Sequence, residues 1–514
     1  MRDKIGIVWF KRDLRLQDHA PLAAAEQSGL KLFYFWIIEP DEWETPENSL
    51  RHWQFQYHSV LQLNEQLSAL NRRIFPIYTS LLALFDYLTQ HYEVEQLWSY
   101  QESGVPRTFQ RDLILADYLK NKGIRWTEFQ RDGIQRGIKN RSQWETHWIN
   151  YINSPCIPFQ ASPSVSCITH FQQFELPKHI DRQLSIYPTD FQKAGTRYAE
   201  RYLNDFLSHR IYTYQKGISK PQMSRTSCSR LSPFLAWGNL SVRQVVQACM
   251  KLKETAALRK NRNAFLSRMQ WHCHFIQKFE TDCSYATNCI NKAFEAHVYE
   301  RNESYINAWK SGQTGFPLID ACMRCLQKTG WINFRMRALL VSFFCHNLLQ
   351  DWKEAAAHLA QLFLDFEPGI HYPQLQMQAG TTGINTIRVY NPVLNSYKHD
   401  PEGVFIQKWL PELRNLPTDC IHEPWKLSAL EAQVYQFELG RDYPFPIIDP
   451  NASRQADRKF LWDIRKSNLA KTDSQRIIER MTKQSVSRKN PKSKQTDRQR
   501  RKDIDPENGQ LSLL

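Results

Sequence analysis

The period of the hydrophobic residues changes once along this chain of 514 residues, and that change limits the folds open to it. Through residues 1–130 short apolar segments alternate with amphipathic helical segments such as 52–70 and 108–122. The predicted strands are residues 6–10, 30–38, 73–78, 96–100 and 124–129. Strands alternating with helices predict an α/β domain with a doubly wound parallel sheet, which binds ligands at the carboxyl ends of its strands. No G-x-G-x-x-G motif follows the first strand, so a Rossmann dinucleotide site is unsupported.

The later part of the chain has a different pattern. From residue 196 to about 465 the apolar residues recur with the helical period, which predicts an all-α second domain. Residues 131–195, rich in Pro, Ser and Gln, predict a connector on the surface. Residues 466–514 are basic and lack aromatics, so we expect a disordered tail that adds DNA affinity or only aids solubility. The expected units are therefore 1–130, 131–195, 196–465 and 466–514.

Composition favours a nucleic-acid partner. The formal net charge of +15 indicates a polyanionic partner, with nucleic acid first and an anionic membrane surface second. Aromatic residues make up 13% of the chain and supply flat surfaces for stacking bases or ring cofactors. The sequence does not open on a signal-peptide pattern, and no apolar run reaches the ~18 residues of a membrane helix. We therefore expect a soluble, cytoplasmic monomer without a membrane partner.

The eleven cysteines follow no regular spacing, which predicts reduced, buried thiols. Cys322 and Cys325 form a C-x-x-C pair within a helical pattern, and no second pair follows at a metal-binding spacing. The sequence therefore predicts no metal site.

Residues 314–337, TGFPLIDACMRCLQKTGWINFRMR, place three arginines among bulky hydrophobic residues. After Asp320 no acidic residue follows until Asp351, so these cations require either an outside partner or a buried cofactor. The alternative is a pair of core helices whose arginines extend from the edges to water.

Four motifs in series resemble the DNA photolyase/cryptochrome family. They are VWFKRDLRLQDH at residues 8–19, CSRLSPFLAWG at 228–238, the stretch 314–337, and RVYNP with DPEG and WLPEL at 388–413. The resemblance runs from residue 5 to about 450 in family order and spacing. It implies an α/β antenna-chromophore domain and a helical domain that binds FAD in a folded form.

The resemblance assigns a set of cofactor residues. Arg337 matches the arginine placed against the flavin ring, with Asp365 as its buried partner and Glu367 as the second acid. Cys228 stands where the family usually has Thr, so a hydroxyl contact is missing unless Thr226 or Ser227 replaces it. The residues assigned to FAD are Tyr214, Cys228, Ser229, Arg230, Leu231, Ser232, Arg337, Asp365, Glu367 and His371. The SRLSP segment resembles a helix start, where free N–H groups favour phosphate.

The resemblance also implies a pocket for a pyrimidine dimer flipped out of damaged DNA. Trp271 and Trp331 match its tryptophans, although ordinary core packing is the alternative reading for both. Arg335 and Arg388 match arginines that hold the lesion or its phosphates. Arg268 occupies a position that is usually Glu or Gln. It can only donate hydrogen bonds, so either lesion recognition differs or Arg268 faces phosphate.

Three further positions depart from the family pattern. His371 aligns with an Asn facing flavin N5, where a histidine would donate a hydrogen bond and titrate near neutrality. The three-tryptophan relay for photoreduction aligns with Leu375, Trp352 and Tyr299, so either another aromatic such as Tyr372 or an external reductant replaces it. The histidine pair of (6-4) photolyases would fall at Phe334 and Ala338 and is absent.

The resemblance further implies an antenna chromophore in the first domain, near Lys11, Arg12 and Asp18, without separating pterin, deazaflavin and flavin types. The predicted function is a deoxyribodipyrimidine photo-lyase that acts on cyclobutane dimers. Its catalytic residues would be Trp271, Trp331, Trp352 and His371. The alternatives are a cryptochrome-like blue-light receptor that binds FAD without repair, and a DNA-binding scaffold without flavin.

Overall fold

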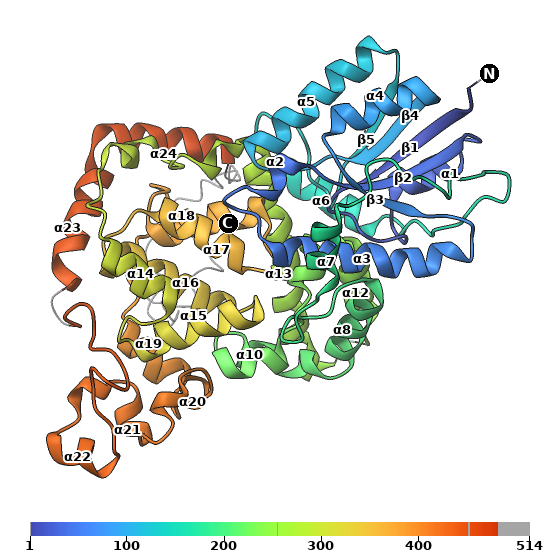
Figure 1. Cartoon of the computed structure of the whole chain (residues 1–514). Coiled ribbons are helices and arrows are strands. Elements are labelled where there is room, and N and C mark those ends of the chain that lie inside the picture. Colours follow the sequence, from blue (N-terminus) through green and yellow to red (C-terminus); the bar gives the residue numbers. More distant parts are fainter. Residues whose placement is uncertain (1, 254, 451–452, 482–514) are drawn as a thin grey trace.

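The computed structural model describes residues 2–253, 255–450 and 453–481. Its first domain is built on five strands in the order β3-β2-β1-β4-β5, and every neighbouring pair is parallel (Figure 1). The strands are β1 (Lys4–Phe10), β2 (Lys31–Ile38), β3 (Ile74–Tyr78), β4 (Glu93–Tyr100) and β5 (Arg125–Phe129). Each lies within three residues of its predicted bounds, so the predicted doubly wound sheet is confirmed.

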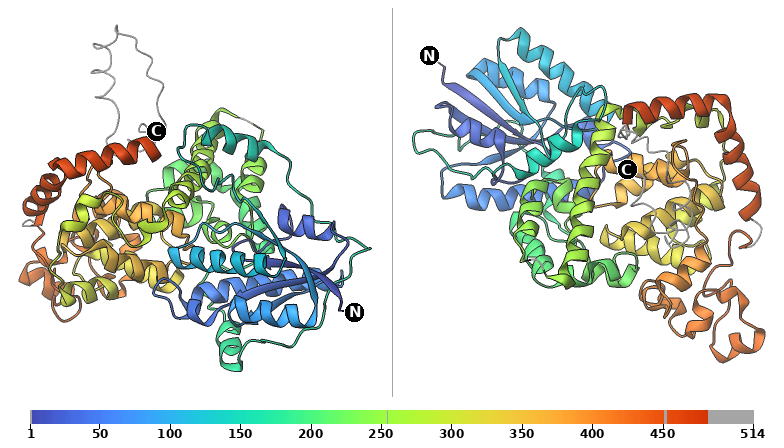
Figure 2. Two further views of the ribbon diagram at one scale, coloured as in Figure 1. Left: turned by 90° about the horizontal axis from the view of Figure 1, so that it is seen from above. Right: turned by 180° about the vertical axis from the view of Figure 1, so that it is seen from behind.

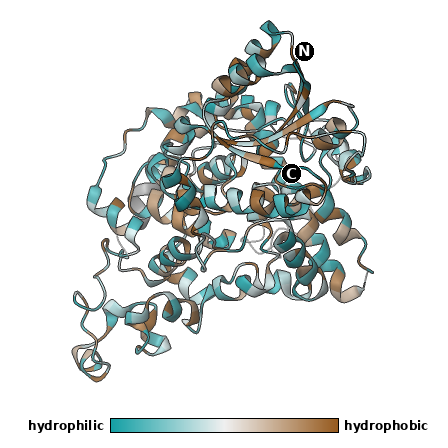
Figure 3. Ribbon diagram, turned by 45° about the vertical axis from the view of Figure 1, so that its right-hand side comes forward, coloured by the Kyte–Doolittle hydropathy of each residue, from teal (hydrophilic) through white to brown (hydrophobic). Residues whose placement is uncertain are grey.

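The apolar runs of the strands have two faces, and helices cover both. Val8 and Phe10 of β1 pack with α1 (Ala20–Glu26) and α3 (Leu50–Ser68), while Ile7 and Trp9 pack with α4 (Leu81–His91) and α5 (Pro106–Asn121). Alternate side chains of a strand point to opposite faces, so a continuous apolar run suits a sheet buried on both sides. Figure 3 shows the hydrophobic colouring along these strands. α2 (Pro40–Trp43) follows β2 and lies at the carboxyl edge of the sheet.

Residues 131–195 were expected to form a connector on the surface. Two helices within this segment bury side chains in the packed core, so the segment is not only a surface connector. α6 (Trp144–Asn153) buries Trp144, Trp148 and Ile152 against α12 (Val242–Met250), and α7 (Lys178–Ser185) packs on α3. These side chains lie at helical spacing within a segment whose Pro, Ser and Gln content masked the pattern.

The second domain is helical, as predicted. It comprises α8 (Thr196–Ser208), η1 (Arg210–Thr213), α9 (Tyr214–Gly217), α10 (Pro221–Ser227), α11 (Ser232–Ala236), α12 (Val242–Met250), α13 (Ala256–Thr281), η2 (Cys283–Ala286), η3 (Lys292–Ala296), α14 (Glu303–Ser311), α15 (Pro317–Thr329), α16 (Phe334–Ser342), η4 (Phe343–Asn347), α17 (Trp352–Leu362), α18 (Pro368–Ala379), α19 (Pro392–His399), α20 (Val404–Trp409), η5 (Pro411–Leu413), α21 (Thr418–Ile421), η6 (Pro424–Lys426) and α22 (Ala429–Val434). None of the described helices is long and apolar enough to cross a membrane.

A disordered tail was expected from residue 466, but the chain is still helical beyond that residue. α23 (Ser453–Lys466) and α24 (Asn468–Met481) form an outer layer on the helical domain (Figure 2). Ile477 of α24 is 1% exposed, and the Asp473 carboxylate accepts from the Lys292 backbone N–H at 2.7 Å. A few apolar residues at helical spacing are enough to dock this charged helix. Residues 482–514 lie outside the described part of the chain.

The loop after β1 fastens the two domains together. The Leu14 N–H donates to the Trp237 carbonyl at 3.1 Å, and the Asn239 amide donates to the Leu14 carbonyl at 2.9 Å. Gly238 has φ +73°, and a Cβ there would lie 2.2 Å from the Arg12 carbonyl oxygen. Only glycine permits this close approach of the two backbones.

Candidate functional site

A cavity of about 330 Å³ lies within the helical domain. Its wall comes from the segment between α9 and α11, from one face of α13, from the turn between α15 and α16, and from the start of α18. This volume falls within the ~300–1,000 Å³ typical of ligand pockets. The predicted residues that line it are Tyr214, Cys228, Ser229, Arg230, Leu231, Ser232, Arg268, Trp271, Trp331, Arg335, Arg337, Asp365 and Glu367. Segments far apart in the sequence thus meet around one space.

The loop of residues 228–232 presents a cation to the cavity. Arg230 has φ +58°, and its carbonyl accepts from the Gln192 amide at 2.7 Å. Its guanidinium lies 4.0 Å from the centre of the Trp331 ring. Burial lowers the pKa of Arg230 to about 10, which leaves the side chain charged at physiological pH. α11 begins at Ser232, so the predicted helix start is present.

The predicted partner of Arg337 is in place. Arg337 Nη1 and Nη2 donate to Asp365 Oδ1 and Oδ2 at 3.0 and 2.8 Å, and Nε donates to the Ile332 carbonyl at 2.9 Å. This two-bond geometry fixes the guanidinium plane. The Arg337 side chain is 23% exposed, against 3% for Asp365, so it is the arginine that opens towards the cavity.

Glu367 connects the cavity to the first domain. Its Oε2 lies 3.2 Å from Arg131 Nη2 and 3.7 Å from Arg12 Nε. Arg12 also lies over the Trp237 ring, 4.3 Å from its centre. The charge of this carboxylate is therefore balanced inside the protein before any ligand binds.

The two predicted lesion tryptophans face the same cavity. Trp271 stacks on Phe275 with 5.6 Å between ring centres, and Trp331 Nε1 donates to Ser232 Oγ at 3.2 Å. Trp331 is also 6% exposed and belongs to a hydrophobic cluster, so packing and cavity lining are combined in this residue. Two aromatic rings that could stack on a base thus line the same cavity as the Arg337–Asp365 pair.

Of the two arginines predicted to hold the lesion or its phosphates, Arg335 lines the cavity and Arg388 does not. Arg335 Nη1 donates to the Tyr390 hydroxyl at 2.9 Å, while its buried Nε has no hydrogen-bond partner in the described part of the chain. Arg388 is half-buried in the segment between α18 and α19 and is not among the lining residues.

His371 was expected to face the flavin, but its side chain does not line the cavity. Its Nε2 is 2.9 Å from the Ala356 carbonyl oxygen, and the ring packs among Phe363, Phe366 and Tyr372 instead of lining the cavity. Burial lowers the pKa of His371 to about 4, so the expectation that it titrates near neutrality is wrong. Its imidazole is neutral and bonded to the backbone.

Trp352 also lies away from the cavity. It is 1% exposed in the main core, and Nε1 donates to Cys289 Sγ at 3.3 Å. Leu375 is buried in the same cluster. Neither position offers a redox-active ring at the cavity wall.

Sequence reasoning missed several cavity residues, and some carry buried polar atoms without a partner. In the described residues these atoms are His272 Nε2, Asn333 Oδ1 and Gln374 Oε1, besides Arg230 Nε and Arg335 Nε. Such unsatisfied groups at a cavity wall fit a ligand with both donors and acceptors, as FAD has. Only His272 could have been found, because it lies four residues after Arg268 on the same face of α13.

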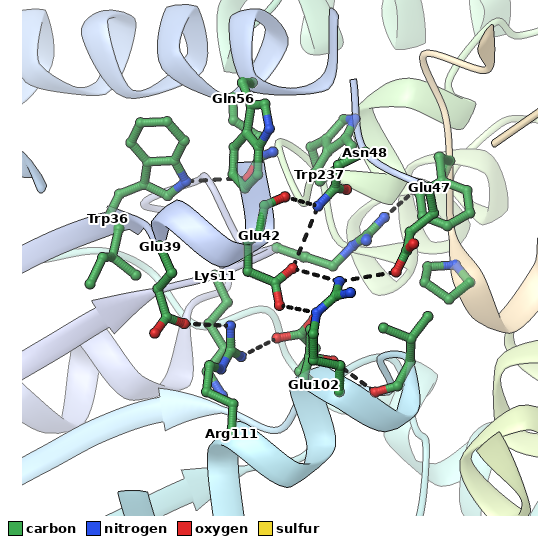
Figure 4. Close-up of a pocket in the computed structure, with 18 of the residues that line it drawn as sticks. Lys11, Trp36, Glu39, Glu42, Glu47, Asn48, Gln56, Glu102, Arg111 and Trp237 are labelled. Carbon is green, nitrogen blue, oxygen red and sulfur yellow. Dashed lines mark hydrogen bonds and ion pairs between the residues drawn. The ribbon is translucent and has the colours of Figure 1, made fainter. Parts of the chain in front are cut away.

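Lys11 and Arg12 line a second, smaller crevice at the carboxyl ends of β1, β2 and β4, together with Trp237 and Phe366 of the helical domain. Figure 4 shows Lys11 and Trp237 among its lining side chains. Its volume is about 80 Å³, and its charges are paired with one another. Lys11 lies 2.7 Å from Asp112, while Arg107 lies 2.8 Å from Glu42 and 3.0 Å from Glu47. With these ion pairs formed, the crevice has no room for a ring chromophore. An antenna chromophore could bind here only if the pairs separated, and its presence stays a prediction.

Asp18 lies outside the crevice. Its carboxylate pairs with Arg243 and accepts from the Ser241 hydroxyl at 2.5 Å and from the Ile157 N–H at 3.1 Å. The side chain is fully buried, so it joins the two domains and does not face a chromophore.

Two family models cover most of the chain. The one described as DNA photolyase matches residues 6–134, and the one described as FAD binding domain of DNA photolyase matches residues 265–463. The chain therefore belongs to the DNA photolyase family, within which cryptochromes also fall, and carries its FAD-binding domain.

The curated relatives include both photolyases and cryptochromes. A deoxyribodipyrimidine photo-lyase of Alkalihalophilus pseudofirmus is 25% identical over 89% of this chain and 98% of its own length. Cryptochrome-2 of Arabidopsis thaliana is 28% identical over 91% of this chain and 80% of its own length. Repair and signalling are not separated at this level of identity.

Solved structures share the fold. A Synechocystis cryptochrome superimposes with a TM-score of 0.80 at 23% identity, covering 89% of this chain and 99% of its own. A Sulfolobus tokodaii photolyase described as holding two FAD molecules has a TM-score of 0.74 at 22% identity, covering 90% of this chain and 99% of its own.

Proposed function

We propose that this protein is a light-driven, FAD-dependent photolyase that repairs cyclobutane pyrimidine dimers in damaged DNA. The observation that carries the proposal is the shared cavity, in which the Arg337–Asp365 pair and the rings of Trp271 and Trp331 line one space. A cofactor-holding group and two base-stacking rings in one cavity suit a reaction that passes between cofactor and base.

The residues that line the cavity have separate roles in this proposal. A bound, reduced FAD supplies an excited-state electron donor for splitting the cyclobutane ring. Arg337, held by Asp365, presents fixed donors to an anionic ring. Trp271 and Trp331 offer stacking surfaces to an extruded dimer, and extrusion is easier at a damaged base pair. The protein positions both partners and excludes water.

Substrate recognition differs from the Glu or Gln pattern of cyclobutane-dimer enzymes, because Arg268 can donate hydrogen bonds to thymine carbonyls but cannot accept one from N3–H. This favours the second candidate function, a blue-light receptor of the cryptochrome type that keeps FAD without repair. The cryptochrome relatives and the shared cryptochrome fold support it.

A light-dependent repair assay with reduced protein separates the two. Defined cyclobutane and (6-4) lesions are incubated with the full chain in blue light and in the dark. Repair of the cyclobutane lesion in light alone supports the proposal, and the (6-4) lesion should persist. Photoreduction of the flavin with neither lesion repaired contradicts it and favours the receptor.

We further propose the interdomain crevice as the place of the antenna chromophore. The two FAD molecules named for the Sulfolobus tokodaii structure support a second ring site in this fold. Binding there requires Arg107 to leave Glu42 and Glu47. An absorption spectrum of the purified protein that contains flavin alone, at one per chain, counts against this proposal.

A further inference from the structure

One face of α13 places two nitrogen-bearing side chains against the cavity. Arg268, Trp271, His272 and Phe275 line it at intervals of three and four residues, which is the spacing of one helical face. Arg268 and His272 are therefore neighbours, one turn apart.

His272 lines the cavity and carries a buried ring nitrogen that lacks a partner among the described residues. Its Nε2 is buried without a hydrogen bond in the described part of the chain. Burial lowers the pKa of His272, so the imidazole is neutral at pH 7 in the empty cavity. A neutral imidazole with a free ring nitrogen can accept a proton and then donate it to an anion.

The charged groups that face His272 from other elements are already balanced. Asp132 and Arg131 follow β5 and lie 3.2 Å apart, while Asp365 and Glu367 precede α18. Asp365 is held by Arg337, and Glu367 by Arg131 and Arg12. These three carboxylates therefore leave little net negative charge to protonate His272.

The neighbouring groups favour an anion at this wall. Arg268 adds a cation one turn before His272. Burial raises the pKa of the Tyr214 hydroxyl, and the nearby charge of Arg268 partly offsets that rise. Tyr214 lines the cavity together with the loop of residues 228–232, in which Arg230 is also charged. The diphosphate is the part of FAD that is anionic in every redox state, and Arg337 is already assigned to the flavin ring, so Arg230 and His272 suit the diphosphate better than the ring.

We propose that His272 binds the diphosphate of FAD and takes up one proton from solvent as it does so, which makes flavin retention depend on pH. This inference rests on the proposed FAD site. Binding of the anion raises the proton affinity of the imidazole, so FAD affinity rises as pH falls between the pKa of the complex and the lower pKa of the empty site. The slope is limited to about tenfold per pH unit for one proton. His371 does not contribute, because its pKa lies at about 4.

The test measures equilibrium binding of FAD and of riboflavin to the full chain from pH 6 to pH 8. For the wild type we expect FAD affinity to rise towards pH 6, while riboflavin, which has no phosphate, shows no such rise. His272→Gln should bind FAD weakly at every pH, and His272→Arg should bind it tightly at every pH. His209→Gln, at an exposed histidine, should keep the wild-type profile.

The outcomes are distinguishable. A wild type that binds FAD with no pH dependence, or a His272→Gln variant that keeps the wild-type profile, overturns the inference and leaves the FAD site intact. An equal pH dependence for riboflavin places His272 at the flavin ring and also overturns it. A wild type that binds no FAD at any pH overturns the proposed function itself.

Discussion

Arg337 and Asp365 form a two-bond ion pair at 3.0 and 2.8 Å that joins the start of α16 to the turn before α18. Removing the arginine leaves the Asp365 carboxylate, only 3% exposed, without its partner. We expect Arg337→Ala to lose most bound FAD and to lower the free energy of unfolding by about 3 kcal/mol. The flavin-to-protein absorbance ratio and a urea titration measure the two effects.

A matched control is available on α15. Arg324 pairs with Glu412 at 2.6 Å and does not line the cavity. Arg324→Ala should therefore retain full flavin. Purifying Arg337→Ala with full flavin as well would contradict the role given to the pair.

The second prediction concerns stacking of the extruded base. Trp271 lines the cavity and stacks on Phe275, so Trp271→Ala removes one stacking face from the cavity wall. We expect affinity for dimer-containing DNA to fall by about 1–3 kcal/mol. Trp462→Ala, at a tryptophan 38% exposed, should bind like the wild type. Unchanged lesion affinity of Trp271→Ala, measured against undamaged DNA, would refute the pocket assignment.

Photoreduction should depend on Tyr372 more than on Trp352. The Tyr372 ring lies 5.1 Å from His371 and 6.3 Å from Phe366, whose chain neighbours Asp365 and Glu367 line the cavity. A phenol can be oxidised and a phenyl ring cannot, so Tyr372→Phe should slow flavin photoreduction, followed by absorption under blue light. Trp352→Phe should leave the rate unchanged. The opposite order of rates would restore the relay position at Trp352, and unchanged rates in both would favour an external reductant.

The crevice of Figure 4 should open when Arg107 is removed. Arg107 bridges Glu42 and Glu47 and thereby fills the space near Lys11. We expect Arg107→Ala to take up more of an added pterin or flavin than the wild type, measured by dialysis of flavin-loaded protein. Arg197→Ala, which breaks an exposed pair with Glu65, is the control. Equal uptake by all three proteins would argue against a chromophore site in the crevice.

The sequence predicted more of the fold than of the site. Strand bounds, the parallel sheet and the helical domain follow from local periodicity, which neighbouring residues alone determine. The same local signal failed at α24, because a charged helix with few apolar residues becomes ordered only by docking, as the bond between Asp473 and the Lys292 backbone illustrates.

Sequence by itself determined which residues are candidates, because the order and spacing of the motifs single out Arg337, Asp365, Trp271 and Trp331. Only the tertiary structure decided which of them share a space and which are already bonded elsewhere. In the structure His371 lies at the Ala356 carbonyl, Asp18 accepts from Ser241 across the domains, and His272 Nε2 has no hydrogen-bond partner among the described residues. The physical reason is that hydrogen bonding and burial depend on partners distant in sequence, which no local pattern records.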